Sequence, residues 1–215
     1  MSLFRLDASI FPATSASRSL GDLVEAEWAA AHPGDTIVRR DVAADPVPAT
    51  AWVDAVTSGG VPEAERTPAQ RAAHALAATY ADELIAADAL LFTVPLYNYG
   101  ISQHVKTWFD LAYTDPRTSM GSTTLQGKPA VLATVLGGNY GPGTPREGWD
   151  HSTGWLRRVL EDVWGLELRV VQRHFTLVGV NPALDDFADL AAELKADAEH
   201  LARTHGQEIA SSRAA

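Results

Sequence analysis

The chain has 215 residues, which predicts one domain over residues 1–215, large enough to bury roughly 70% of the surface that its unfolded form exposes. It contains no cysteine, which excludes disulfides, thiolate nucleophiles, thiolate metal sites and iron–sulfur clusters. Its 17 basic and 27 acidic residues give a net charge of −10, which argues against a nucleic-acid or anionic-membrane partner. Any redox chemistry must then belong to an organic cofactor or to a metal held without thiolates.

The sequence also lacks the patterns that are typical of targeting signals, membrane-spanning segments and metal sites. The opening residues, MSLFRLDASIF, show no basic region followed by a long apolar stretch, and no apolar run is long enough to span a membrane. The seven histidines show neither an HExxH pattern nor a paired i, i+4 spacing. We therefore expect a soluble cytoplasmic protein without a metal site.

Strands and helices alternate through the first half of the chain. A short strand over residues 3–8 leads through a polar loop into a helix over 18–32 that has one apolar stripe. A second strand covers 36–41, and an alanine-rich helix over 67–87 starts with a threonine cap and a proline in its first turn. Residues 50–62 are weakly patterned, and no element is predicted there.

The alternation continues in the second half. A continuous apolar run over residues 89–94 stops at Pro95 and predicts a buried parallel strand. The remaining predicted elements are a helix from residue 101, a strand over 130–136, a helix over 149–164, a fifth strand made of 168–171 and 174–180 with a bend or bulge between them, and an amphipathic helix over 185–209.

This alternation predicts an α/β fold in three layers, with a five-stranded parallel sheet between helices on both faces. The strand order 2-1-3-4-5 of flavodoxin-like folds is the best fit to five strands, and it places the switch point between the first and third strands. Because ligands bind outside the carboxyl ends of such strands, we expect three loops to meet around one crevice. They are residues 9–17, 95–99 and 137–140.

The first loop is rich in hydroxyl side chains at the start of a helix. Unpaired amides and the positive end of the helix dipole favour a phosphate there, and serine hydroxyls can donate to its oxygens. The alternative is that Ser17 or Ser19 only caps the helix. Arg18 could approach the phosphate, although we expect it to be an exposed helical residue.

The other two loops offer flat surfaces and accessible backbone. Tyr97 and Tyr99 present apolar faces with polar tips, and Asn98 can donate and accept hydrogen bonds, which suits a planar heteroaromatic ring. Alternatively, the two tyrosines simply cover the end of the sheet. Gly137 and Gly138 allow backbone amides to approach a ligand closely, although an ordinary tight turn also explains them.

Three motifs together resemble a known family. They are the Ser-x-Ser loop after the first strand, PLYNYGISxxxKxWFD after the third, and GKPAVLATVLGGNYGPG around the fourth. The combination is similar to the FMN-dependent NADH azoreductases, also described as FMN-dependent NADH:quinone oxidoreductases, from residue 3 to about 182. The resemblance implies a flavodoxin-like fold, a homodimer and a tightly bound FMN in the crevice.

The resemblance also implies roles for individual residues. Ser9 and Ser15-Ala16-Ser17 would hold the FMN phosphate. Pro95 and Leu96-Tyr97-Asn98-Tyr99 would line the isoalloxazine and ribityl groups, and Val135-Leu136-Gly137-Gly138 would meet the pyrimidine side of the ring. No catalytic residue is assigned, and Tyr97 and Asn98 are candidates for positioning the ring or the acceptor.

The chain departs from the family pattern at several of these positions. Family members commonly have Gln at the position of Ala16 and Ser-Arg at Val135-Leu136. A His that often follows the double glycine is replaced by Tyr140, and a Phe common after the third helix is replaced by Ser119. We therefore expect the substrate range to be the least transferable property.

The implied reaction is a two-electron ping-pong transfer. NADH would deliver a hydride to FMN, and a quinone or azo compound would then take two electrons in the same place. Two other functions are consistent with the sequence: a non-enzymatic flavodoxin-like electron carrier, and an FMN-binding regulatory protein.

Overall fold

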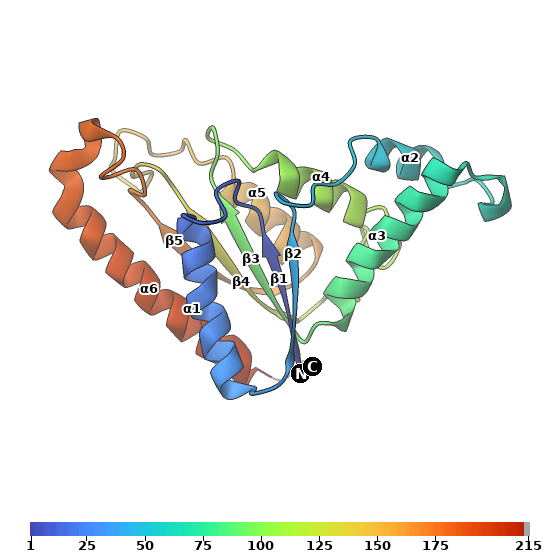
Figure 1. Ribbon diagram of the computed structural model, residues 1–215, viewed down its shortest axis with the longest axis horizontal. Coiled ribbons are helices and arrows are strands. Elements are labelled where there is room, and N and C mark those ends of the chain that lie inside the picture. Colours follow the sequence, from blue (N-terminus) through green and yellow to red (C-terminus); the bar gives the residue numbers. More distant parts are fainter. Residues whose placement is uncertain (213–215) are drawn as a thin grey trace.

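The computed structural model describes residues 1–212. Its strands form one parallel sheet in the order β2-β1-β3-β4-β5 (Figure 1). The strands are β1 (Ser2–Asp7), β2 (Thr36–Asp41), β3 (Ala89–Pro95), β4 (Pro129–Val135) and β5 (Glu167–Arg173). The predicted five-stranded parallel sheet and its 2-1-3-4-5 order are confirmed.

Helices cover both faces of the sheet (Figure 1). On one face lie α1 (Ala16–Ala31) and α6 (Ala188–Ser211), which follows a 3-10 turn, η3 (Pro182–Phe187). On the other face lie α3 (Pro68–Ala86), α4 (Gln103–Ala112), and α5 (Thr153–Arg157), which continues as a π-helical segment, η2 (Arg158–Val163). A short α2 (Ala51–Thr57) packs against α3 and α4, and η1 (Glu63–Glu65) precedes α3.

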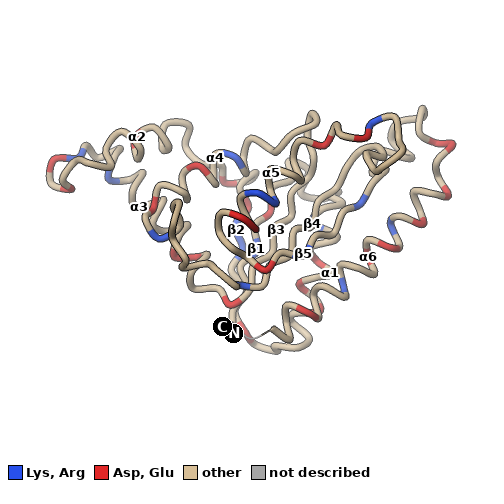
Figure 2. Tube along the Cα trace, turned by 180° about the vertical axis from the view of Figure 1, so that it is seen from behind, with Lys and Arg blue, Asp and Glu red and all other residues tan. Residues whose placement is uncertain are grey.

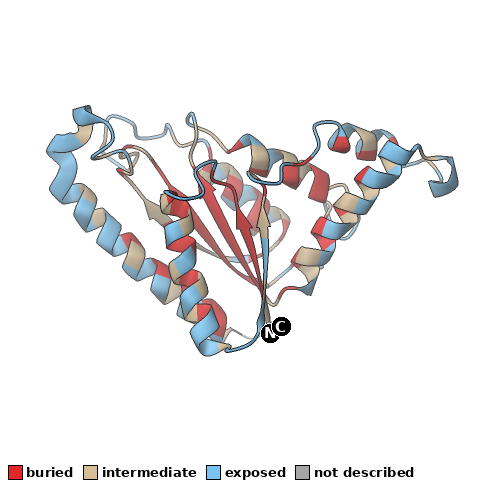
Figure 3. Cartoon of the chain, viewed as in Figure 1, coloured by how far each residue is buried: buried red, intermediate tan, exposed pale blue. Residues whose placement is uncertain are grey.

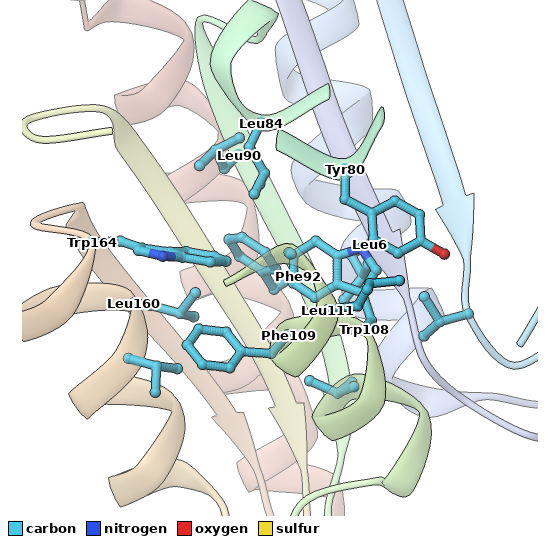
Figure 4. Close-up of a cluster of buried hydrophobic side chains, with 14 of the residues drawn as sticks. Leu6, Tyr80, Leu84, Leu90, Phe92, Trp108, Phe109, Leu111, Leu160 and Trp164 are labelled. Atoms are coloured by element: carbon cyan, nitrogen blue, oxygen red, sulfur yellow. The ribbon is translucent and has the colours of Figure 1, made fainter. Parts of the chain in front are cut away.

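The inner strands carry the core, because every residue of β3 and β4 is buried (Figure 3). One apolar cluster lies between the sheet and α3, α4 and α5, and the second lies between the sheet and α1 and α6. Trp108 is the centre of the first cluster, with its ring 6.3 Å from that of Phe4 and 6.0 Å from that of Trp164 (Figure 4). Trp108 and Phe109 therefore belong to the core in this chain.

Helix α1 lies unusually close to the sheet at Gly21. A Cβ atom on this residue would be only 2.4 Å from Cγ2 of Thr93 on β3. The absence of a side chain therefore lets the first half of α1 press onto the sheet next to the carboxyl end of β1. This close packing sets where the amino terminus of α1 points.

Two predictions about elements need correction, and one helix was not predicted. Residues 174–180 are not a strand, because Phe175 adopts a left-handed φ of 56° and the following residues form turns. The helix predicted over 149–164 begins only at Thr153. Helix α2 was not predicted, since its apolar side chains do not form one buried stripe: Trp52, Val53 and Val56 are exposed.

Charged residues of both signs are spread along the chain, including along α6 (Figure 2). Within residues 1–212, no helix combines the length and the apolar character that crossing a bilayer requires.

Candidate functional site

A cleft of about 590 Å³ opens at the carboxyl ends of β1, β3 and β4, which form the upper edge of the sheet in Figure 1. This is where parallel α/β sheets bind ligands, and the volume is typical of a small-molecule site. All three loops predicted from the sequence contribute to its walls. The lining residues are Ser9, Phe11, Thr14, Ser15, Ala16, Pro95, Leu96, Tyr97, Asn98, Tyr99, Val135, Gly137, Tyr140, Arg146, Thr176, Leu177 and Val180.

Some predicted residues do not line the cleft, and some lining residues were not predicted. Ser17 and Leu136 are fully buried, and Gly138 lies beneath the side chain of Arg146. The lining residues within 176–180 were missed because their alternating pattern was interpreted as a strand. Arg146 was missed because the stretch after the glycine loop has no periodic pattern.

The amino terminus of α1 forms one end of the cleft. Ser15, rather than Ser17 or Ser19, is its cap, because the Ser15 Oγ accepts a hydrogen bond from the Arg18 amide at 3.3 Å. The Ser15 and Ser17 hydroxyl oxygens lie 3.0 Å apart. The free amides of the first helical turn and this hydroxyl pair together favour an anionic ligand.

Arg18 secures the loop that precedes α1. Its Nη2 donates to the Ser9 carbonyl at 3.1 Å and to the Asp41 carboxylate at 2.6 Å. The expectation that Arg18 is simply exposed is wrong, because only 16% of its side chain is accessible. Its buried Nε has no hydrogen-bond partner within the described residues. One N–H of this guanidinium is therefore left without a partner among residues 1–212, although its charge is paired with Asp41.

A buried ion pair lies beneath this loop. The Asp7 carboxylate accepts from Nε and Nη2 of Arg5, both at 3.1 Å, and from the Thr93 hydroxyl at 2.6 Å. Burial disfavours the charged form of Arg5, but Asp7 and Asp22 outweigh it, so that the Arg5 pKa is raised. Because these charges are fully paired, they form a rigid floor that joins β1, β3 and α1.

The loop after β3 makes a tight turn. Asn98 and Tyr99 have φ values of 49° and 66°, and the backbones of Tyr97 and Gly100 exchange hydrogen bonds of 3.2 and 3.0 Å. This is a type I′ turn, in which a tyrosine in the left-handed region is costly. Backbone strain of this kind is concentrated at binding sites.

Tyr97 connects this turn to the first loop. Its hydroxyl lies 3.2 Å from the Ser9 Oγ and accepts from the Ile10 amide at 3.2 Å. Tyr99 packs its ring edge against Trp149 with 5.6 Å between centroids, and its carbonyl accepts from the His151 amide. The tyrosines are thus fixed at both ends of the cleft opening.

The third loop presents backbone rather than side chains. Val135 accepts a hydrogen bond at its carbonyl from the Leu96 amide at 2.9 Å, which ties the second and third loops together. A Cβ on Gly137 would be 2.7 Å from Cδ1 of Leu177, because residues 175–177 fold back over the glycines. A side chain at Gly137 would have to displace the Leu177 side chain, so in this structure the wall is backbone.

His174 supports the same loop from behind. Its Nδ1 accepts a hydrogen bond from the Tyr140 amide at 3.2 Å. Burial lowers the pKa of His174, and the opposing effect of Asp150 is smaller. The histidine is therefore held neutral, which keeps Nδ1 available as an acceptor.

These features fit a flat cofactor that carries a phosphate. The amino terminus of α1 with the hydroxyls of Thr14 and Ser15 lies at one end, whereas aromatic faces and glycine backbone lie at the other. Hydrophobic and aromatic walls with a few polar groups are typical of cofactor sites. The residues present are thus chemically suited to FMN.

Comparison with known proteins identifies the family. A family model described as flavodoxin-like fold matches residues 1–201. The FMN-dependent NADH:quinone oxidoreductase of Streptomyces avermitilis is 37% identical over 210 residues, which cover 97% of this chain and 96% of the relative. The chain belongs to the FMN-dependent NADH:quinone oxidoreductase family.

Other members and solved structures agree. The FMN-dependent NADH:quinone oxidoreductase of Xanthobacter autotrophicus is 40% identical over 166 residues, which cover 74% of this chain and 78% of the relative. The crystal structure of an azoreductase from Bacillus anthracis has a TM-score of 0.77 at 20% identity, and covers 96% of this chain and 99% of that one. The crystal structure of an FMN-dependent NADH-azoreductase from Bacillus anthracis in complex with FMN has a TM-score of 0.70 at 16% identity. The match covers 94% of this chain and 99% of that one. The structural matches support the shared fold.

The positions expected from the resemblance to differ from the family pattern lie in and around the cleft. Ala16, Val135 and Tyr140 line it, whereas Leu136 is fully buried. Ser119 lies outside the lining and donates its hydroxyl to the Pro116 carbonyl. No group of three acidic or histidine side chains suited to a metal ion occurs within residues 1–212.

Proposed function

We propose that this protein is an FMN-dependent oxidoreductase that uses NADH to reduce quinones, azo compounds or both. The observation that carries the proposal is the convergence of three loops, from β1, β3 and β4, on one cleft with the amino terminus of α1 at one end and tyrosine side chains at the other. Membership in a family of relatives with this named activity, over nearly the whole chain, supports it.

The proposed cofactor site uses the residues named from the sequence. Ser9 and residues 15–17 would hold the phosphate, with Arg18 as an added cation. Residues 95–99 would line the flavin ring and ribityl chain, and residues 135–138 would face the pyrimidine edge. Ala16, Val135, Leu136 and Gly138 would contribute through their backbone atoms, since their side chains offer no polar group.

FMN, when bound, supplies the redox chemistry, in which a hydride arrives from NADH and two electrons leave to the acceptor in a second half-reaction. The protein orients the ring and shapes the space above it. Tyr97 and Asn98 are the proposed positioning groups, because both lie at the turn that closes the cleft. No carboxylate, lysine or histidine lines the cleft among the described residues. Solvent can supply the protons that a reduced quinone requires, so no catalytic acid is needed.

The two alternative functions receive less support. An electron carrier would be expected to have a strongly acidic rim, whereas the only charged lining residue described here is an arginine. An FMN-binding regulatory protein would not need a cleft open to a second substrate. The named relatives are oxidoreductases.

Initial-rate kinetics test the proposed function. With NADH and a quinone varied together, a ping-pong enzyme gives parallel double-reciprocal lines. Intersecting lines would indicate that both substrates bind at once, and the absence of turnover in flavin-loaded protein would reject the enzymatic function.

The proposal extends to assembly and location. By resemblance the protein is a cytoplasmic homodimer, and exposed apolar residues such as Trp52, Val53 and Trp149 offer surface that a second copy would cover. Light scattering would show twice the mass of one chain. We also propose that residues 1–215 form one folding unit, for which calorimetry of the flavin-free protein would show a single transition.

A further inference from the structure

Arg146 is the only charged residue in the lining of the cleft among the described residues. It lies in the loop between β4 and α5, outside the segments expected to hold FMN. Its side chain is exposed, and no carboxylate pairs with it within residues 1–212. An unpaired guanidinium at the mouth of a site is available to a ligand.

Neighbouring residues hold the Arg146 side chain over the cleft wall. The guanidinium carbon lies 5.8 Å from the centroid of the Tyr140 ring, and Nη1 lies 3.5 Å from the Tyr140 hydroxyl. A Cβ on Gly138 would be 3.2 Å from the same Nη1. The guanidinium therefore rests between an aromatic face and glycine backbone, which leaves its remaining donors free.

The loop that carries Arg146 is itself ordered by short-range hydrogen bonds. The Thr144 hydroxyl donates to the Gly141 carbonyl at 2.8 Å, and the Glu147 carboxylate accepts from the Gly143 amide at 2.8 Å. The Trp149 amide donates to the Arg146 carbonyl at 3.1 Å. Arg146 is thus presented by a structured loop, which reduces the entropy lost when it binds a ligand.

The charge of the whole chain makes this arginine important. The protein carries a net charge of −10, which repels anionic molecules at long range. A planar guanidinium matches the geometry of carboxylate, sulfonate and phosphate groups. A single cation in an otherwise uncharged cleft therefore selects for an anion in that position.

We propose that Arg146 recognises an oxyanion on the molecule that occupies the cleft above the cofactor, and that it thereby determines substrate specificity. Two sources share this chemistry: a carboxylate or sulfonate on a flat aromatic acceptor, and the diphosphate of the nicotinamide dinucleotide. The proposal rests on the proposed function, since it assigns a substrate contact within the same cleft.

The test compares Arg146→Gln with the wild-type holoenzyme in separate half-reactions. The acceptors are 1,4-naphthoquinone and its 2-sulfonate. Arg146→Lys retains the charge, and Arg158→Gln, at an exposed arginine on η2, is the matched control. Reoxidation of the reduced protein reports on the acceptor, and anaerobic reduction reports on NADH.

If the acceptor supplies the anion, Arg146→Gln lowers the second-order rate constant for the sulfonate by about tenfold or more, because a charge-assisted hydrogen bond is lost. The rate with the neutral quinone changes less than about twofold, as expected for a residue whose contact is with the charge alone. If the dinucleotide supplies it, the apparent dissociation constant of NADH rises by a similar factor, and reoxidation by both quinones is unchanged. In either case Arg146→Lys restores part of the effect, and added salt weakens the affected step in wild type and Arg146→Lys but not in Arg146→Gln.

An Arg146→Gln protein that matches wild type in both half-reactions would overturn the proposal. Its failure is distinct from failure of the proposed function, which would leave the wild type unreduced by NADH. In that case the anion contact is still tested by titrating the FMN-loaded protein with naphthalene-2-sulfonate and following the visible spectrum of the bound FMN. Arg146-dependent binding would support it, and equal binding by wild type and Arg146→Gln would reject it.

Discussion

The hydroxyl of Tyr97 lies 3.2 Å from the Oγ of Ser9, which joins the loop after β3 to the loop after β1 across the carboxyl edge of the sheet. The same hydroxyl accepts from the Ile10 amide. These two loops form the walls of the proposed cofactor site, so the Tyr97 hydroxyl helps to set their relative position.

Removal of that hydroxyl should weaken cofactor binding. Tyr97→Phe keeps the aromatic face and loses both hydrogen bonds, and we expect FMN affinity to fall by about 5- to 10-fold, which corresponds to about 1 kcal/mol. Fluorescence titration of flavin-free protein with FMN measures this. Tyr113→Phe, at the end of α4, is the matched control and should bind FMN as the wild type does. Equal affinities for all three proteins would contradict the role of Tyr97.

A negative charge at Ser15 should expel the phosphate. Asp is as good a helix cap as Ser, so Ser15→Asp should leave α1 and the stability of the flavin-free protein intact. Repulsion between carboxylate and phosphate should nevertheless lower FMN affinity by at least about tenfold, an effect that added salt reduces. Ala64→Asp, which adds the same charge on η1, should have no effect. Unchanged FMN retention by Ser15→Asp would place the phosphate elsewhere.

The buried pair of Asp7 and Arg5 should be important for stability. Asp7→Asn removes the buried carboxylate that accepts hydrogen bonds from Nε and Nη2 of Arg5, while Asp22 and Glu25 still pair with Nη1, and we expect a loss of about 1.5–3 kcal/mol in the free energy of unfolding. Urea denaturation of the flavin-free protein measures this. The exposed pair of Lys106 and Asp110 provides the comparison, because Asp110→Asn should cost less than about 1 kcal/mol. Similar losses for the two variants would show that the buried pair stabilises the fold no more than an exposed pair does.

His174 should make stability depend on pH. Burial lowers the pKa of His174 in the folded protein below the ordinary value of 6.5. Between these two pKa values the unfolded chain therefore binds more protons than the folded protein does. The contribution of neutral His174 is therefore present above pH 6.5 and is lost as the pH falls toward the folded pKa. The stability difference between wild type and His174→Gln should shrink between about pH 7.5 and 5.5.

A pH-independent difference would show that protonation of His174 does not weaken the fold. Gln207→Ala, at an exposed residue of α6 that does not titrate, is the control, and its difference from wild type should stay flat.

The sheet could be predicted because its inner strands are continuous apolar runs. Both inner strands, Ala89–Pro95 and Pro129–Val135, are buried on both faces. Their residues are therefore almost all apolar, and no alternation with polar residues obscures the strand signal. Helix α2 lacks this signal, because the side chains it exposes are as apolar as those it buries. Residues 174–180 alternate as a strand does, but the left-handed Phe175 turns the chain back over the glycine loop.

The cleft was predictable only in part. Chain topology brings the three loops together, and that was foreseen from the strand order. The type I′ turn was not, because Asn98-Tyr99 lacks the glycine that usually marks one. The contacts of Arg18 and Arg146 join residues distant in sequence or in an irregular loop, and no local pattern encodes such contacts.

The most direct test of the account is the visible spectrum of the purified protein before and after anaerobic addition of NADH. We predict that FMN co-purifies or can be reconstituted, that one equivalent of NADH bleaches its absorbance, and that a quinone added afterwards restores it. Protein that cannot be loaded with FMN, or bound FMN that NADH leaves unbleached, would contradict the assignment of this cleft as a flavin-dependent active site.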